Sequence, residues 1–343
     1  MTTKDEVKVL WKLCFTDSEE FTDLYFDLRY RDDINMAVRE EGKIISALQM
    51  IPYPMTFCGE TIATSYISGA CTHPDYRSHG AMRRLLGLTH RRMYDDGILL
   101  STLIPAEKWL LGYYAKSGYT PRFGYVMERI NVEELTPSGS YRVKEEDGDW
   151  VELYQYFDSR MRERVCCVQH SYEDFLVIMA DLRLGGGKLL VARKADRIAG
   201  LAFVVMDTGI LYVKELLADG IPGQAGFEAV KDTLLSAAAI LYPEAVIEYI
   251  HPSSGDSSTL GMARLIHVEK MLFILARKHP VLSFSIQIEG DDAIPENNGY
   301  YIVENGNCYH GYREGREYHC YTIESLTAKL LETEHPYMSL MLN

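Results

Sequence analysis

Little in this sequence fits a membrane protein or a secreted one. No apolar run approaches the roughly 18 residues that a membrane-spanning helix needs, and the N-terminal stretch MTTKDEVKVLWKLC is charged where a secretion signal would be apolar. The seven cysteines form an odd number without a CxxC pair, a pattern that favours free thiols over a disulfide framework or a zinc site. We therefore expect a cytoplasmic protein that binds no metal.

Positive charge is also scarce. The chain has 35 Lys and Arg residues against 49 Asp and Glu residues, which gives a formal net charge of −14. Such a protein is repelled at long range by nucleic acid and by anionic membrane surfaces, and it attracts cationic partners. We expect neither nucleic acid nor a membrane as a partner, and a polyphosphate ligand would need a local basic pocket.

The 343 residues are enough for two or three domains of roughly 100–200 residues each. Turn signals and hydrophobic periodicity predict a mixed α/β sheet in the first segment. The expected elements are helices at 5–15 and 17–30, three antiparallel strands within 35–73, a long helix after Gly80, a strand within 96–105, a helix within 106–119 and a strand at 120–132.

The rest of the chain repeats this plan and then departs from it. Residues 185–252 predict three strands, a helix and a strand, without an arginine at the turn that corresponds to the one before Gly80. The pattern then predicts a helix over 260–280, strands within 283–323, a short helix and an apolar tail that packs against the protein. The predicted domains are 1–137, 138–260 and 261–343.

One turn in the first segment combines a glycine with basic residues at the start of a helix. Arg77 and Gly80 precede the helix, and Arg83 and Arg84 lie near its start. The first N–H groups of a helix lack partners and carry positive partial charge, so this turn suits a pyrophosphate, which glycine allows to approach closely. The same residues also fit an ordinary junction between a loop and a helix, and both interpretations stand at this point.

A second segment, GYYAKSGY at 112–119, makes the first one more specific. Together the two segments resemble the GCN5-related N-acetyltransferases. That family's coenzyme A signature, Gln/Arg-x-x-Gly-x-Gly/Ala, matches Arg77 and Gly80 and departs at Met82. Its aromatic-Tyr-x-Lys-x-Gly-aromatic segment matches Tyr113, Tyr114, Lys116, Gly118 and Tyr119.

The resemblance implies an α/β (α+β) fold with two tandem mixed sheets flanked by helices, and acetyl-CoA as the acyl donor. By the same resemblance, the strand before the turn at Arg77–Met82 pairs with the pantetheine arm, that turn holds the pyrophosphate, and Tyr114 donates a proton to the departing thiolate. The implied coenzyme residues are Ala70, Cys71 and Thr72 on the strand and Arg77, Ser78, His79, Gly80, Ala81 and Met82 in the loop.

A narrower resemblance extends over nearly the whole chain. With PENNGYY at 295–301, the third segment is similar to that of the enhanced-intracellular-survival acetyltransferases, whose last domain resembles sterol carrier proteins. This resemblance implies a homo-oligomer and a terminal carboxylate, here that of Asn343, as the base. It also implies a broad small-molecule or peptidyl amine acceptor, such as an aminoglycoside, a polyamine or a lysine side chain.

Other interpretations accompany these expectations. A retained fold without catalysis would make the chain a lipid-binding or partner-binding protein, and a transferase could instead use a longer acyl group. Cys71 could carry an acyl group or simply pack on the sheet, and Tyr113 and Tyr114 cannot both face one site. Adjacent Cys166 and Cys167 rarely chelate one ion, so no metal is assigned there.

Overall fold

The computed structural model of the chain describes residues 1–145, 149–252 and 257–342. The chain divides into two compact units, the first made of Met1–Phe123 with Thr259–Pro336 and the second of Gly124–Ser258 with Tyr337–Leu342. It passes from the first unit to the second within strand β7 (Thr120–Arg129) and returns within β13 (Ser258–Leu265). The three predicted domain boundaries stay predictions.

The first unit is built on a mixed sheet. Its strands follow the order β1 (Asn35–Glu40), β2 (Lys43–Pro52), β5 (Thr64–Thr72), β6 (Leu100–Leu103) and β13. The pairs β1–β2, β2–β5 and β6–β13 are antiparallel and β5–β6 is parallel. Between β2 and β5 the chain forms a separate short hairpin of β3 (Met55–Phe57) and β4 (Glu60–Ile62).

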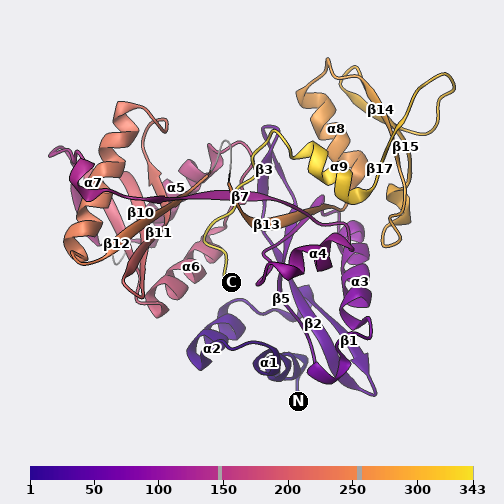
Figure 1. The fold of residues 1–343 in the computed structure, drawn as a ribbon, viewed down its shortest axis with the longest axis horizontal. Helices are drawn as coiled ribbons and strands as arrows, with labels where there is room; N and C mark the ends of the chain where they lie inside the picture. The colour runs from indigo at the N-terminus through magenta and orange to yellow at the C-terminus, as the bar shows by residue number, and fades with distance from the viewer. Residues whose placement is uncertain (146–148, 253–256, 343) are drawn as a thin grey trace. The chain divides into compact units, whose positions relative to one another are not determined.

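Helices cover both faces of this sheet (Figure 1). Ile45 and Leu48 of β2 pack on one face with α3, and Ile44 and Ala47 pack on the other with α1. The members of each pair are three residues apart, a spacing that the register shifts of β2 at Ile45 and Leu48 allow. The helices are α1 (Thr3–Cys14), α2 (Glu19–Leu28), α3 (Ala81–Asp95) and α4 (Trp109–Ala115). All four were expected from the sequence, so the predicted helical framework of this segment is confirmed.

The third segment contributes to the first unit in a way that the sequence pattern did not indicate. The helix predicted over 260–280 is wrong in its first part, because residues up to Leu265 belong to β13, whose Met262–Leu265 pair with β6; within this range only α8 (Val268–Lys278) is helical. A short apolar run fits a buried strand and a buried helix equally well. A smaller sheet follows, in the order β16 (Asn307–His310), β15 (Gly299–Glu304), β14 (Phe284–Ile288) and β17 (His319–Tyr321), and then α9 (Ile323–Leu330).

The PENNGYY stretch joins these parts through buried polar contacts. The Arg264 guanidinium of β13 donates to Asp291 at 2.7 Å, and both side chains are almost fully buried. The Asn297 amide donates to Asp291 (3.0 Å) and to the Ile266 carbonyl (3.0 Å), and its oxygen accepts from the Val268 N–H (3.1 Å). The motif that carried the narrower resemblance therefore has a structural role here.

The second unit is also a mixed sheet between helices. Its strands follow the order β7, β12 (Val246–His251), β11 (Ile210–Ala218), β10 (Arg197–Asp207), β9 (Lys188–Lys194) and β8 (Arg142–Glu145). The three strands, the helix α7 (Ala225–Leu241) and the strand predicted within 185–252 are confirmed, and the first of these strands begins at Lys188. Helices α5 (Trp150–Arg162) and α6 (Tyr172–Leu184) were not predicted; they pack on the face opposite α7.

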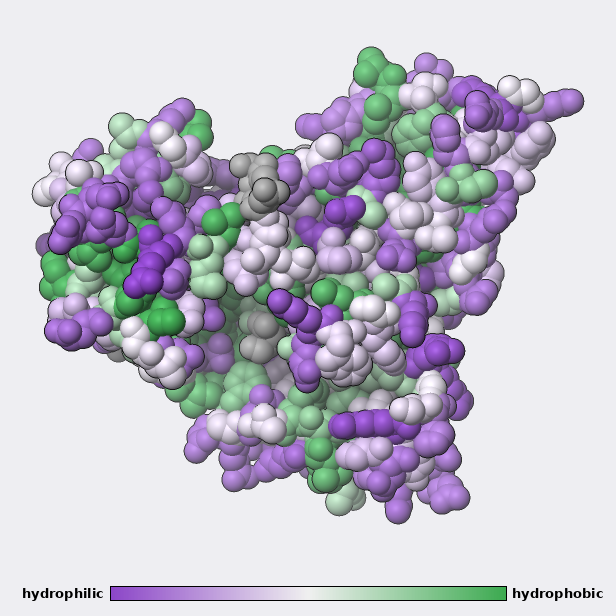
Figure 2. Space-filling view, viewed as in Figure 1, coloured by the Kyte–Doolittle hydropathy of each residue, from purple (hydrophilic) through white to green (hydrophobic). Residues whose placement is uncertain are grey.

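Both units thus have the α/β class predicted from the sequence. The face drawn in Figure 2 is largely hydrophilic, as expected for a chain with a net charge of −14. Across the described ranges, we find no helix that combines the length and the apolar character needed to cross a membrane.

Candidate functional site

The turn between β5 and α3 is shaped to receive an anion. Gly80 occupies the N-cap of α3 with φ +84°, and Ser78 is also left-handed with φ +65°. No side chain caps α3 and no acidic residue lies in its first turn, whereas Thr2 and Ser18 cap α1 and α2. The first N–H groups of α3 are therefore available to an external acceptor, and the helix dipole favours a negative one.

Basic side chains surround this helix start. The Arg77 Nε donates to the Thr72 carbonyl at 3.1 Å, which ties the turn to the end of β5. Arg77, Arg83 and Arg84 are exposed. A Cβ added at Gly80 would meet nothing within 4 Å, so the space above the turn is open. The structure thus brings together the loop residues that the sequence predicted, in a positive and accessible environment.

The strand before the turn separates from its parallel neighbour. Pairing between β5 and β6 joins Thr64–Tyr66 to Leu100–Thr102, while β5 continues to Thr72 and pairs on its other side with β2. Ala70, Cys71 and Thr72 therefore lie beyond the parallel pairing. This is the arrangement expected of a strand whose backbone binds an extended ligand.

Gly69 is a part of the site that the sequence reasoning missed. The β2–β5 register shifts between Ala47 and Gln49, opposite this glycine, which has φ +60°. A Cβ at Gly69 would lie 2.1 Å from the Trp11 ring, so only glycine fits. A bulge changes the direction of the backbone that follows it, which here is Ala70–Thr72. A lone glycine within a predicted strand was the available signal.

Cys71 packs against the first helices. Its side chain is buried in a cluster with Val7 and Trp11, and a hydrogen bond with Cys14 together with burial raises its pKa well above the ordinary thiol value. A protonated, buried thiol is a poor nucleophile. These contacts favour the packing interpretation of Cys71 over an acyl-cysteine.

Cys14 is a second feature that the sequence did not reveal. Its Sγ lies 3.3 Å from the Thr72 carbonyl oxygen, the acceptor that Arg77 also uses. A hydrogen bond with the Cys71 thiol, and then the Arg77 guanidinium, lower the pKa of Cys14 to about 6. Because Cys14 and Arg77 are far apart in sequence, no local pattern could have joined them.

Tyr114 lies on α4 and is the more buried of the two adjacent tyrosines, with 8% of its surface exposed. Its ring lies 5.5 Å from that of Tyr113 and 5.9 Å from that of Tyr119. Burial, with smaller contributions from Tyr113 and Cys71, raises the pKa of Tyr114 to about 12. The pKa of Tyr114 therefore lies above the ordinary phenol value of about 10, and Tyr114 stays protonated throughout the physiological range.

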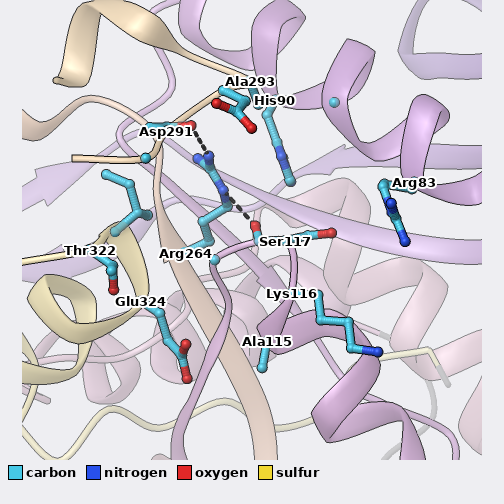
Figure 3. A pocket seen from close by; sticks show the side chains of 15 residues that line it. Arg83, His90, Ala115, Lys116, Ser117, Arg264, Asp291, Ala293, Thr322 and Glu324 are labelled. Atoms are coloured by element: carbon cyan, nitrogen blue, oxygen red, sulfur yellow. Dashed lines mark hydrogen bonds and ion pairs between the residues drawn. The ribbon is translucent and has the colours of Figure 1, made fainter.

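A pocket of about 430 Å³ lies beside α3 and the end of α4, within the first unit (Figure 3). Arg83 and Lys116 supply positive charge to its lining, and Asp292 and Glu324 supply negative charge. His90, whose pKa burial holds well below its ordinary value, contributes a neutral imidazole that hydrogen-bonds to Tyr119 at 3.0 Å. The lining includes neither Tyr114 nor residues 77–82, so this pocket neighbours the predicted coenzyme residues without containing them.

The corresponding turn of the second unit has a different chemistry. There the Glu228 carboxylate, in the first turn of α7, accepts the Gly223 N–H at 2.9 Å. The negative charge that a helix start attracts is thus supplied by the chain itself. This arrangement agrees with the missing arginine noted in the sequence.

The tail predicted to pack against the protein does so within the second unit. Tyr337, Met338, Met341 and Leu342 are buried, and Tyr337 forms a bridge with Cys167. Asn343, the predicted base, lies outside the described residues.

Comparison with known proteins agrees with this geometry. Residues 2–122 match the family model described as an acetyltransferase (GNAT) domain. No curated protein sequence matches the chain.

Solved structures of similar fold include a GCN5-related N-acetyltransferase from Anabaena variabilis, with a TM-score of 0.78 and 15% identity over 97% of this chain and 96% of that one. Another, from Kribbella flavida, has a TM-score of 0.76 and 15% identity over 99% and 95%. Eis1 from Mycobacterium abscessus has a TM-score of 0.74 and 13% identity over 96% and 87%. At these identities the likeness shows a common fold.

Proposed function

Because residues 2–122 form an acetyltransferase (GNAT) domain, we propose that the chain is an acetyl-CoA-dependent N-acetyltransferase. The observation that carries the proposal is the exposed, uncapped start of α3, which directly follows a strand that has separated from β6. An anionic, extended ligand such as coenzyme A suits both features. The active unit in this proposal is the first, because the corresponding turn of the second unit has no arginine and the first turn of α7 carries the Glu228 carboxylate.

The coenzyme-binding residues follow from this arrangement. The backbone of Ala70, Cys71 and Thr72 pairs with the pantetheine arm. The turn formed by Arg77, Ser78, His79, Gly80, Ala81 and Met82 holds the pyrophosphate. Open space over Gly80 and the exposed guanidinium of Arg77 support a phosphate at this turn.

The reaction is direct transfer. The neutral amine attacks the thioester carbonyl carbon, the carbon–sulfur bond breaks, the amine nitrogen loses a proton and the thiolate gains one. With a pKa of about 12, Tyr114 is a weaker acid than a thiol of pKa near 8.5, so it first stabilises the developing thiolate as a hydrogen-bond donor. The base in this proposal is the Asn343 carboxylate.

The acceptor is an amine that is cationic before it reacts, such as an aminoglycoside, a polyamine or a lysine side chain. The acidic balance of the chain supports attraction of such a compound. On the sequence resemblance, the proposal includes the enhanced-intracellular-survival type, with a sterol-carrier-like third domain and assembly into homo-oligomers; the likeness to Eis1 supports the common fold. We place this activity in the cytoplasm, and the proposal involves no metal.

The test combines coenzyme binding with thiol release on a panel of amines. Tyr114→Phe removes the phenol proton and is expected to lower kcat by about a hundredfold, while the Kd for acetyl-CoA stays within about twofold. Tyr113→Phe is the matched control and keeps near-parental kcat. A chain that binds no acetyl-CoA would contradict the proposal and favour a non-catalytic lipid-binding or partner-binding protein. Longer acyl donors in the same assay test the acyl preference.

A truncation tests the base separately. Removal of the last three residues is expected to abolish turnover and to leave acetyl-CoA binding intact, because the coenzyme residues lie elsewhere in the chain. Unchanged turnover in this truncation would rule out the Asn343 carboxylate and leave the transferase itself standing.

A further inference from the structure

A close contact between helix α1 and strand β5 brings two cysteine side chains together. Trp11 of α1 packs on the backbone of Gly69, where an added Cβ would lie 2.1 Å from the Trp11 ring. Cys14 follows Trp11 by about one turn of α1, and Cys71 follows Gly69 by two residues of β5. Both cysteines pack in the cluster around Trp11, and their thiols are hydrogen-bonded to each other. The fold of the first unit therefore creates a pair of neighbouring thiols.

The two thiols differ in access and in electrostatic environment. Cys14 is half-buried, whereas Cys71 is only 4% exposed. The Thr72 carbonyl oxygen lies 3.3 Å from Cys14 Sγ and accepts from Arg77 Nε at 3.1 Å, so the guanidinium lies beside the outer thiol. The last turn of a helix carries negative partial charge, which by itself disfavours a thiolate at Cys14. The Cys71 thiol and the Arg77 guanidinium oppose this effect and lower the pKa of Cys14.

We propose that Cys14 and Cys71 form a peroxide-sensitive thiol pair, in which Cys14 is oxidised first and Cys71 then converts it to a disulfide. Accessible cysteines with thiolate character and a second cysteine beside them are the usual sites of reversible oxidation. The pair lies entirely within the first unit. The disulfide would join the end of α1 to the part of β5 that precedes Thr72, the residue whose carbonyl binds Arg77.

Hydrogen peroxide supplies the oxidant for both steps. The Cys14 thiolate attacks one peroxide oxygen and the O–O bond breaks, which gives a sulfenic acid and a hydroxide that takes up the proton released by Cys14. The Cys71 sulfur then attacks the Cys14 sulfur, the S–O bond breaks, and the Cys71 proton leaves with the hydroxyl group as water. Two thiols and one peroxide thus give one disulfide and two waters.

The contact with Cys14 compensates for the low intrinsic reactivity of Cys71. A buried, protonated thiol is a poor nucleophile toward a molecule in solution. Two groups that are held together react as if one of them were present at a very high concentration, so the second step needs neither access nor a thiolate in solution. The packing of Trp11 on Gly69 holds α1 close to β5 and thereby keeps the two thiols together.

The first measurement detects the disulfide directly. The full-length reduced protein is treated with a small molar excess of hydrogen peroxide at about pH 7, its remaining thiols are blocked in denaturant, and unreduced peptides are analysed by mass spectrometry. The expected main product is a linked pair of peptides that contain Cys14 and Cys71, and a thiol reductant should remove the link. Cys320→Ser is the matched control, because it removes an exposed cysteine of the same unit that contacts Gln287. This variant should form the link in parental yield.

Variants of the pair test the order of the two steps. Cys14→Ser should leave Cys71 reduced at the same peroxide dose, because the buried thiol is shielded from solution. Cys71→Ala should stop the second step and raise dimedone labelling of the Cys14 sulfenic acid by about tenfold. Arg77→Gln should slow the oxidation of Cys14 about threefold, since it removes the positive charge beside the thiolate. The parental measurement needs no substitution in the core and decides the proposal by itself.

Two results would overturn the thiol pair. A sulfinic acid at Cys14 with Cys71 still reduced would show that the second thiol does not resolve the first. Oxidation of Cys71 at the parental rate in Cys14→Ser would show that Cys14 is not the first site. A linked peptide in the parent that is absent from both Cys14→Ser and Cys71→Ala supports the pair.

A coupling to the coenzyme follows if the proposed function holds, and it is measured separately. Phosphate groups at Arg77 would oppose a nearby thiolate, so saturating acetyl-CoA is expected to slow formation of the link about threefold. Acetyl-CoA that binds in a calorimeter but leaves this rate unchanged would overturn the coupling and leave the thiol pair standing. If acetyl-CoA does not bind at all, the proposed function fails, and the linked peptide still decides whether the pair exists.

Discussion

At the scale of single residues, the turn before α3 depends on a conformation more than on a side chain. Gly80 has φ +84°, where a Cβ meets no neighbour but the backbone is unfavourable for other residues. Ser78, two residues before Gly80, also adopts a left-handed φ. In the proposed site, Arg77 contributes charge and Gly80 contributes the backbone conformation at the start of α3.

Gly80→Ala is therefore expected to weaken acetyl-CoA binding by about five- to thirtyfold, since a left-handed alanine costs roughly 1–2 kcal/mol. Isothermal calorimetry measures the effect. Gly87→Ala is the matched control, because Gly87 lies within α3, has an ordinary helical conformation and has no atom within 4 Å of an added Cβ. It should bind acetyl-CoA normally and unfold at an equal or higher urea concentration. Equal affinity of the two variants would contradict the assignment of the turn.

Cys14 gives a prediction about pH. Its pKa is lowered to about 6, so it is mostly thiolate at pH 7, whereas an ordinary thiol of pKa near 8.5 is mostly protonated. The rate of its alkylation by iodoacetamide should therefore increase as the pH rises through about 6, and it should change little above about pH 7. Peptide mass spectrometry follows the modification. A midpoint near pH 8.5 would show that Arg77 and Cys71 do not stabilise the thiolate, and Cys14→Ser should remove the early phase.

At the scale of elements, strand β13 ties the third segment to the first sheet. The Arg264–Asp291 pair joins this strand to the stretch before β15, and Arg264 Nε also donates to the Ser117 carbonyl at 2.9 Å. Gly118 has φ +83°, a left-handed conformation that glycine adopts without strain. Glycine also leaves room for the guanidinium, because an added Cβ would lie 3.1 Å from Arg264 Nε. The end of α4 and the third segment are thus braced by the same guanidinium.

Asp291→Ala should destabilise the first unit by about 3–5 kcal/mol, because it leaves the Arg264 charge buried without its carboxylate. Urea unfolding followed by circular dichroism measures the change. Asp95→Ala, which removes one partner of the exposed pair with Arg91, is the control and should cost no more than about 1 kcal/mol. A similar loss of stability in Asp291→Ala and Asp95→Ala would contradict the idea that burial makes the Arg264–Asp291 pair important. The double variant Arg264→Met with Asp291→Leu should recover part of the stability that Asp291→Ala loses.

At the scale of the whole molecule, two units of one fold class differ in what occupies a helix start. In the first unit basic side chains surround the start of α3, and in the second the first turn of α7 carries the Glu228 carboxylate, which accepts the Gly223 N–H. The repetition of a supersecondary plan therefore does not imply repetition of a ligand site.

We accordingly expect one acetyl-CoA to bind per chain. Titration calorimetry should give a stoichiometry of one, and Arg77→Glu in the first unit should abolish that binding because it places a negative charge at the pyrophosphate. Glu228→Gln should change neither value, since the second turn still lacks an arginine. A stoichiometry of two, or binding that survives Arg77→Glu, would contradict this assignment.

Local sequence signals were sufficient for much of the framework. Glycines, prolines and hydrophobic periods act over a few residues, and they located α1 to α4, the strands β9 to β12 and the turn at Arg77–Gly80. They failed where the signal was ambiguous, because the apolar run of β13 fits a helix equally well. Helices α5 and α6 were not predicted, although their N-cap residues Asp149 and Ser171 are local start signals.

The sequence by itself determined the fold class, the basic turn before α3 and the lack of an arginine in the corresponding turn of the second unit, because each depends on residues close together in the chain. Only the tertiary structure decided that β13 completes the first sheet, that Cys14 lies beside Arg77, that Tyr114 is buried and that the tail packs within the second unit. These relations join residues far apart in sequence. They depend on which surfaces meet when the chain packs, and no local pattern encodes that choice.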